Sequence, residues 1–219
     1  MKKNAFTLAE VLITLAIVGV VAAVSLPTLN TNVQKQGLSS QIAKFYNQYT
    51  KAIEMYKVDN ELDELPNSFD ADAFVRRYFK VTQKCERQGN SGNPTAECFA
   101  DSYRAIKGNA SYLGSDIYST VGTAYMLADG AVMSLRNDGR VVTFDVNGRK
   151  GPNINGYDLQ TFTIYDDGSI DDVSLATRMN HPEQVRTQVQ QNFQSCLRSA
   201  DEYGGCFGHL LRNGFRFDY

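Results

Sequence analysis

The chain has 219 residues, and its 22 basic and 24 acidic side chains give a net charge of −2. This balance excludes a general electrostatic attraction to nucleic acid or to anionic lipid. Hydrophobic residues make up 42% of the chain, so the roughly 160 residues that follow the N-terminal apolar region can bury one globular core.

The N-terminal apolar run contains a single ionisable side chain. Between Phe6 and Leu29 that residue is Glu10, and as a helix this stretch is roughly 36 Å long, enough to span a bilayer. A carboxylate inside such a segment costs roughly 2.5–3.5 kcal/mol on insertion scales. Glu10 therefore either reaches back to the lipid headgroups or awaits a positive partner from another molecule.

The residues before the apolar run favour a cytoplasmic N-terminus, because Lys2 and Lys3 immediately precede it. An ordinary secretory signal is the alternative, since Ala23-Val24-Ser25 has the small-x-small pattern of a cleavage site. Glu10 speaks against that alternative, because it falls where the apolar core of a signal should begin.

The helical pattern also continues beyond Ser25. Apolar residues recur there at spacings of three and four, which places them on one face of a helix: Leu38, Ile42, Phe45, Tyr49, Ile53 and Tyr56. We therefore expect one long helix that ends near Val58, with a membrane half at 6–29 and an amphipathic half at 30–58.

The stretch Ala5-Phe6-Thr7-Leu8-Ala9-Glu10 resembles the class III signal of type IV pilins and type II secretion pseudopilins. In that family a short basic leader ends in a small residue, cleavage exposes a phenylalanine whose amine is then methylated, and a glutamate follows four residues later. The resemblance implies a leader at 1–5, cleavage between Ala5 and Phe6, and Glu10 as the family's glutamate. Ala5 stands where glycine is usual.

The resemblance gives Glu10 a role in assembly. In such filaments the glutamate meets the N-terminal ammonium of a neighbouring subunit, which here would be that of Phe6. Two opposite charges about 4 Å apart gain roughly 4 kcal/mol at an effective dielectric constant near 20, comparable with the cost of burying the carboxylate. Glu10 would then mark the register of assembly.

The resemblance further implies an α+β, pilin-like fold, in which a long N-terminal helix, the membrane stem, packs on the antiparallel β-sheet of a head at 59–219. The expected function is polymerisation into a type IV pilus-like or type II secretion pseudopilus filament. The expected partners are other pilin or pseudopilin subunits, a prepilin peptidase and methyltransferase, and an inner-membrane assembly platform with its ATPase.

The expected location is single-pass in the inner, cytoplasmic membrane before assembly, with a cytoplasmic leader and a periplasmic or extracellular head. The filament would then be periplasmic or on the cell surface. Two alternatives are an adhesive or DNA-uptake minor pilin and a membrane-tethered periplasmic domain that never polymerises. No nucleic-acid partner is expected, because Arg140, Arg149 and Lys150 do not define a basic, aromatic groove.

The four cysteines indicate disulfides in an oxidising compartment. Cys85 and Cys98 bracket a polar loop at 88–94, and Cys196 and Cys206 bracket a turn with two glycines. Neither spacing is the C-x-x-C of a zinc or redox site. Of the three possible connectivities we favour the local one, Cys85–Cys98 and Cys196–Cys206.

Asp-Gly turns between alternating apolar segments predict an antiparallel sheet. These turns are at Asp129-Gly130, Asp138-Gly139 and Asp167-Gly168. The expected strands are 124–128, 131–135, 141–145, 161–165 and 169–172.

Two further helices are expected in the head, one at 70–79 and one opened by Pro182. The terminal alternation of Phe215, Phe217 and Tyr219 is consistent with an edge strand.

The loop from Asp145 to Asp158 concentrates side-chain oxygens, supplied by Asp145, Asn147, Asn153 and Asp158. Calcium takes six to eight oxygen ligands, and some relatives bind it in a head loop, so calcium is the one candidate cofactor. The spacing departs from an EF-hand, which has glutamate at its twelfth position, where Gly156 stands. We favour the alternative of a loop braced by Asx turns.

An enzymatic function is not expected. The sequence has no Walker loop, no H-E-x-x-H and no G-x-S-x-G segment. His181 and His209 stand outside any motif, and a lone histidine beside a turn is usually solvated or capping.

Overall fold

The structure is a computed structural model that describes residues 7–67, 69–86, 98–107, 110–111, 123–135, 139–172, 185–199 and 204–219. The leader at 1–5, Phe6, the expected loop at 88–94 and Pro182 lie outside these residues. The chain divides into two compact units, Met1–Gly37 and Leu38–Tyr219, and each is described by itself.

The first unit contains the beginning of α1 (Leu8–Asp59), which is assigned as one helix over its whole length. Within it, Leu8–Ser25 has a mean hydropathy of 2.4, and none of this stretch is buried inside the chain. Among the described residues, this is the one helix long and apolar enough to cross a membrane. Its exposed apolar surface requires a cover of lipid or of other apolar helices.

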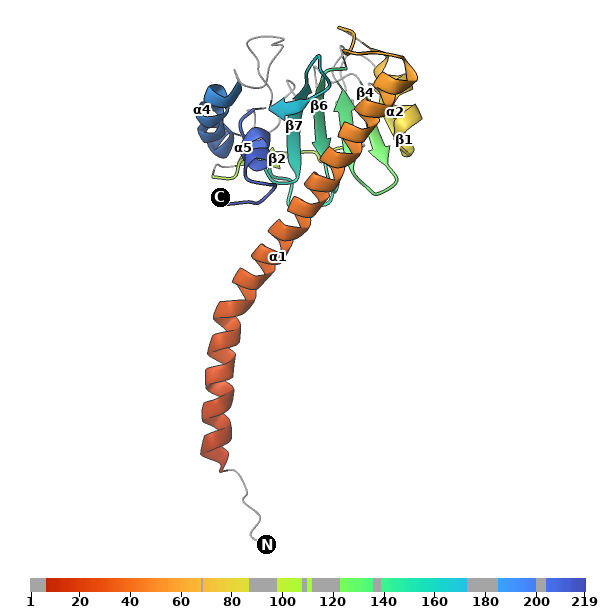
Figure 1. The fold of residues 1–219 in the computed structure, drawn as a ribbon. Coiled ribbons are helices and arrows are strands. Elements are labelled where there is room, and N and C mark those ends of the chain that lie inside the picture. Colours follow the sequence, from red (N-terminus) through yellow and green to blue (C-terminus); the bar gives the residue numbers. More distant parts are fainter. Residues whose placement is uncertain are drawn as a thin grey trace. The chain divides into compact units, whose positions relative to one another are not determined.

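The second unit contains the rest of α1, a six-stranded sheet, a two-stranded sheet and, in the described part of the chain, three more helices (Figure 1). The helices are α2 (Ala71–Tyr78), α4 (Val185–Arg198) and α5 (Cys206–Arg212). The strands are β1 (Val81–Glu86), β2 (Tyr103–Arg104), β3 (Ala110–Ser111), β4 (Thr123–Leu127), β5 (Val132–Leu135), β6 (Val141–Asp145), β7 (Leu159–Ile164) and β8 (Ile170–Asp172).

The six-stranded sheet is antiparallel throughout, in the order β1-β4-β5-β6-β7-β8. The glycines of all three predicted Asp-Gly turns have positive φ, Gly130 at 88°, Gly139 at 75° and Gly168 at 91°, a conformation that glycine adopts without steric cost. The predicted α+β fold with an antiparallel sheet is confirmed. Strand β1 was not predicted. It pairs with β4 (Cys85 opposite Ala124) across a long intervening segment, so no short hairpin turn in the sequence indicates the pairing.

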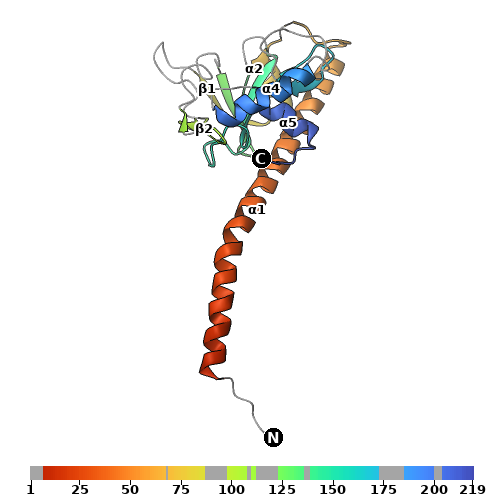
Figure 2. The same ribbon diagram turned by 90° about the vertical axis from the view of Figure 1, so that its left-hand side faces the viewer.

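The C-terminal part of α1 lies across one face of this sheet, as Figures 1 and 2 show from two sides. Phe45 stacks on Phe144 of β6 with ring centroids 4.1 Å apart, and Tyr49 meets Phe162 of β7 edge-on at 5.1 Å. The buried helix face is the one that the apolar spacing predicts: Leu38, Ile42, Phe45, Tyr49 and Ile53. Each such side chain stabilises the packing by roughly 1.5–3 kcal/mol.

Helix α1 ends at Asp59, one residue beyond the predicted end, in a Schellman motif. The N–H of Leu62 donates to the carbonyl of Lys57 at 2.9 Å, and the N–H of Glu61 donates to the carbonyl of Val58 at 3.2 Å. Glu61 has φ of 53°, the left-handed conformation that costs a residue with a side chain roughly 1–2 kcal/mol. This turn therefore has a fixed backbone.

The segment after this turn is held by Arg140, whose side chain is 9% exposed. Its guanidinium donates to the carbonyl oxygens of Leu65 at 2.9 Å and Pro66 at 2.6 Å. It also forms an ion pair with Asp166 at 2.8 Å. Arg140 thus joins the segment after α1 to the turn between β7 and β8.

The C-terminal region differs from the prediction. The expected edge strand at 215–219 is wrong, because these residues have no strand partner in the described part of the chain and Phe215 has φ of 59°. Their aromatic alternation serves side-chain packing instead: Tyr219 stacks on Tyr157 at 5.6 Å, and Phe217 meets Tyr157 edge-on at 5.0 Å. Helix α5 was not predicted.

Candidate assembly site

Glu10 lies in the first turn of α1, where it forms a capping box with Thr7. Glu10 Oε2 accepts hydrogen bonds from the Thr7 backbone N–H and from the Thr7 hydroxyl, each at 2.8 Å. Thr7 Oγ1 accepts from the Glu10 N–H at 3.3 Å. The T-x-x-E spacing is visible in the sequence as a helix start signal, and the sequence reading of Glu10 missed it.

The capping box holds the Glu10 carboxylate beside the N-terminus of α1, where the helix dipole favours a negative charge. Only one of its two oxygens has a hydrogen-bond donor among the described residues. The other oxygen is available to a cation supplied by a second molecule. Ala5 and Phe6, the predicted processing residues, lie outside the described residues, so pairing of Glu10 with the Phe6 ammonium stays a prediction.

The head contains two disulfides, Cys85–Cys98 and Cys196–Cys206, with Cα–Cα distances of 6.2 and 5.8 Å. This is the local pairing favoured from the sequence. The first disulfide joins the end of β1 to the segment before β2, and the second joins α4 to the start of α5. The two disulfides close loops of 13 and 10 residues. In the chain-entropy model each such disulfide stabilises a fold by about 3 kcal/mol.

The loop after β6 begins with the buried carboxylate of Asp145. Its Oδ1 accepts the backbone N–H groups of Asn147 and Gly148 at 2.9 and 2.8 Å. Its Oδ2 accepts the Tyr103 hydroxyl at 2.5 Å. Burial, with the nearby charge of Asp158, raises the pKa of Asp145 from 3.8 to about 7.

The same loop ends at Asp158, which is also buried. Its carboxylate accepts the N–H of Asn153 at 2.6 Å and the N–H of Ile154 at 2.7 Å, one on each oxygen. Burial raises the pKa of Asp158 as well. The two carboxylates therefore brace both ends of one loop through its own backbone.

These contacts are those of a loop braced through its own backbone, whereas calcium takes six to eight oxygen ligands. All four carboxylate oxygens of Asp145 and Asp158 already accept N–H or O–H groups. Two further candidate ligands, Asn147 Oδ1 and Asn153 Oδ1, are buried without a hydrogen-bond partner in the described part of the chain. In that part no group of three or more His, Cys, Asp or Glu side chains could hold a metal.

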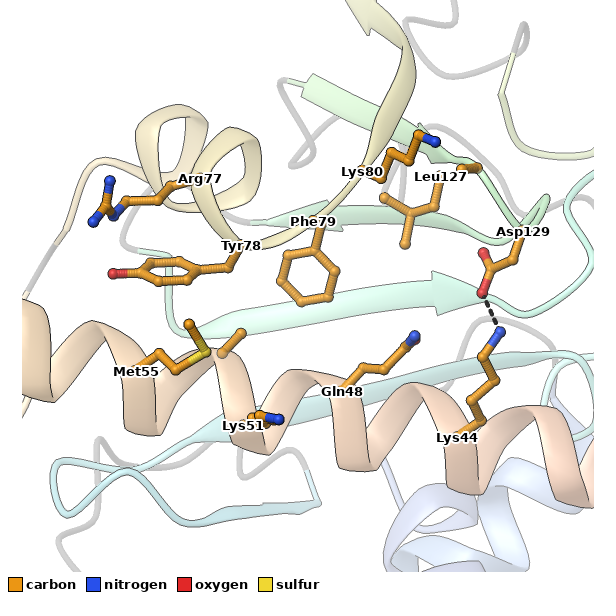
Figure 3. Close-up of a pocket in the computed structure, with 12 residues that line it drawn as sticks. Lys44, Gln48, Lys51, Met55, Arg77, Tyr78, Phe79, Lys80, Leu127 and Asp129 are labelled. Carbon is orange, nitrogen blue, oxygen red and sulfur yellow. Dashed lines mark hydrogen bonds and ion pairs between the residues drawn. The ribbon is translucent and has the colours of Figure 1, made fainter.

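The basic residues singled out from the sequence do not form a groove. Arg140 is buried in the contacts given above, and Arg149 forms an ion pair with Asp101 at 2.8 Å and donates to the carbonyl of Phe99. A groove does lie between α1 and the α2–β1 connection, and four cationic side chains line it (Figure 3): Lys44, Lys51, Arg77 and Lys80. The sequence could not reveal it, since these residues come from two separate segments.

A long N-terminal helix with an apolar first part, followed by a six-stranded antiparallel sheet with helices, is the α+β layout of pilin-like proteins. Residues 1–26 match the family model described as the prokaryotic N-terminal methylation motif, the signature of type IV pilins and pseudopilins. Proteins with this motif are structural subunits. No curated protein and no solved structure matches the chain.

Proposed function

We propose that this chain is the precursor of a filament subunit of the type IV pilus or type II secretion pseudopilus kind. It is cleaved between Ala5 and Phe6, methylated on the new amine, and polymerised through its N-terminal helix. The observation that carries the proposal is the methylation motif at residues 1–26, in register with an apolar helix that the chain itself leaves uncovered.

In this proposal the leader is 1–5, the membrane half of the helix is 6–29, its amphipathic half is 30–58 and the head is 59–219. Before assembly the apolar half is covered by lipid, with the head on the far side of the inner membrane from the leader. In the filament the same surface is covered by the stems of neighbouring subunits, so one apolar surface serves two states. The partners are the peptidase and methyltransferase, the assembly platform and other subunits.

Glu10 has a defined part in this proposal. Its Oε1 accepts a hydrogen bond from the Phe6 ammonium of a neighbouring subunit, while its Oε2 continues to accept the hydrogen bonds from Thr7. Cleavage before Phe6 leaves the Thr7 N–H in place, so the mature chain keeps the capping box. The charge pair then fixes the register of one stem against the next.

The first experiment is the intact mass of the protein extracted from membranes of its own cells. We expect a chain that begins at Phe6, carries one methyl group and contains two disulfides. A chain that begins at Leu26 would indicate a secretory signal, and one that begins at Met1 would indicate a simple anchor. Either result contradicts the proposal.

The second experiment asks whether the processed subunit polymerises. Filaments sheared from the cells, or released from the periplasm, should contain the processed chain, and an Ala5→Asp variant that blocks cleavage should stay in the membrane fraction. A processed wild-type chain that never leaves that fraction would instead favour the membrane-tethered domain.

A further inference from the structure

The groove in Figure 3 is a basic surface on a chain whose net charge is slightly negative. It has a volume of about 390 Å³ and runs between α1 and the end of α2. Lys44 and Lys51 line it from α1, and Arg77 and Lys80 line it from the α2–β1 side. We call these four residues the basic groove.

Two of these cations have no partner of their own. Lys44 pairs with Asp129 at 2.8 Å, and Arg77 pairs with Asp59 at 2.9 Å. Lys51 and Lys80 are exposed, and neither side-chain ammonium has an ion pair or hydrogen bond with any residue that the structure describes. The basic groove therefore has at least two positive charges to offer to another molecule.

The same unit also carries unpaired negative charge at the end of α1. In the segment Glu61–Glu64, which we call the acidic turn, Glu61, Asp63 and Glu64 are exposed, and their carboxylates have no partner within the described ranges. The Schellman motif fixes the backbone at the start of this turn, and Arg140 holds the segment that follows. The acidic turn thus presents three carboxylates on a rigid support.

A chain that forms an open filament must carry two different complementary surfaces, because each subunit binds the next one head to tail. We propose that the acidic turn of one subunit docks in the basic groove of the next. This inference rests on the proposed polymerisation and adds a contact between heads to the packing of the stems. Charge complementarity favours this occupant. The ammonium groups of Lys51 and Lys80 have no anionic partner among the described residues, and the carboxylates of the acidic turn have no cationic partner there.

The test reverses the charges of the full chain in its own cells. Lys51→Glu combined with Lys80→Glu should lower the yield of sheared filaments about tenfold, because like charges then face each other across the contact. Adding Glu61→Lys and Glu64→Lys to the same chain should restore the yield. Each yield is divided by the amount of processed subunit, and both disulfides are checked on a non-reducing gel as a measure of folding.

Two controls make the result specific. Lys150→Glu reverses an exposed lysine outside the basic groove and should leave the yield unchanged. A carbodiimide, which joins a lysine directly to a contacting carboxylate, should link Lys51 or Lys80 to the acidic turn in wild-type filaments. The products should form a ladder beyond the dimer, as a head-to-tail contact requires.

Several outcomes overturn the docking proposal. They are a normal yield from the double reversal, a loss that the compensating changes do not restore, or cross-links that stop at a dimer. Loss of single-stranded oligonucleotide binding by the double reversal, with a normal filament yield, would assign the basic groove to nucleic acid instead. Absence of filaments from the processed wild-type chain would refute the proposed function itself, so the two failures are distinguishable.

Discussion

The two contacts assigned to Glu10 can be separated by comparing Glu10→Gln with Thr7→Val. Glutamine keeps the geometry of the capping box, because its side-chain oxygen still accepts from Thr7, but it removes the negative charge. Valine at position 7 has nearly the shape of threonine and removes the hydroxyl, while the carboxylate stays. One variant therefore tests the charge and the other tests the cap.

The expected magnitudes differ widely. The hydroxyl of Thr7 contributes one of the two hydrogen bonds to Oε2, at 2.8 Å, and loss of a helix cap costs about 1 kcal/mol. Removing one member of a buried ion pair costs about 3–5 kcal/mol. At 1.4 kcal/mol per factor of ten, the cap corresponds to about fivefold in assembly, and the pair to about a hundredfold or more.

The assay measures filament yield per processed subunit when the variant is the sole copy in the cell. Thr7→Val should lose no more than about fivefold, whereas Glu10→Gln should be processed, remain in the membrane fraction and give almost no filaments. A loss from Thr7→Val together with little or no loss from Glu10→Gln would mean that Glu10 acts through the capping box alone. A wild-type yield from Glu10→Gln would refute the charge pair.

Three predictions concern the head, each measured on the full chain in detergent. Arg140→Met should lower the free energy of unfolding in urea by about 1–3 kcal/mol, because it leaves the carbonyl oxygens of Leu65 and Pro66 without their donor. Arg149→Met, which breaks an exposed pair, should cost less than about 1 kcal/mol, and equal costs would contradict the role of Arg140. Because the pKa of Asp145 is raised in the fold from 3.8 to about 7, the folded head keeps a proton that the unfolded chain has released, so stability should fall as the pH rises through that range. Asp145→Asn should flatten this dependence, and an unchanged slope would assign it to other groups. Millimolar calcium should leave the melting temperature unchanged, and an increase would show that the loop binds the ion after all.

The sequence predicted the features that depend on neighbouring residues. The apolar spacing from Leu38 to Ile53 identified the helix face that packs on the sheet, because a period of three and four is a local property. The Asp-Gly turns identified the hairpins for the same reason, and short separations identified the disulfides. The methylation motif was readable because its charge, phenylalanine and glutamate all fall within a few residues.

The features that the sequence did not predict depend on contacts between distant segments. Strand β1 pairs with β4 across more than thirty-five residues (Glu86 and Thr123 are partners), and the basic groove joins α1 to the end of α2. The burial of Arg140 could not be predicted, because its carbonyl partners, Leu65 and Pro66, are distant from it in the sequence. The terminal aromatic residues alternate as in a strand, but their rings pack on Tyr157 and on one another, so the same pattern has a second physical cause.

The short loops closed by the two disulfides have a consequence for how the cysteines find their partners. Closing 13 or 10 residues costs less chain entropy than joining cysteines that lie a hundred residues apart. Each native pair is therefore the one that an unfolded head forms most readily. The cysteine spacing thus guides oxidation toward the native pairs, and the head needs little help from a disulfide isomerase to reach its final pairing.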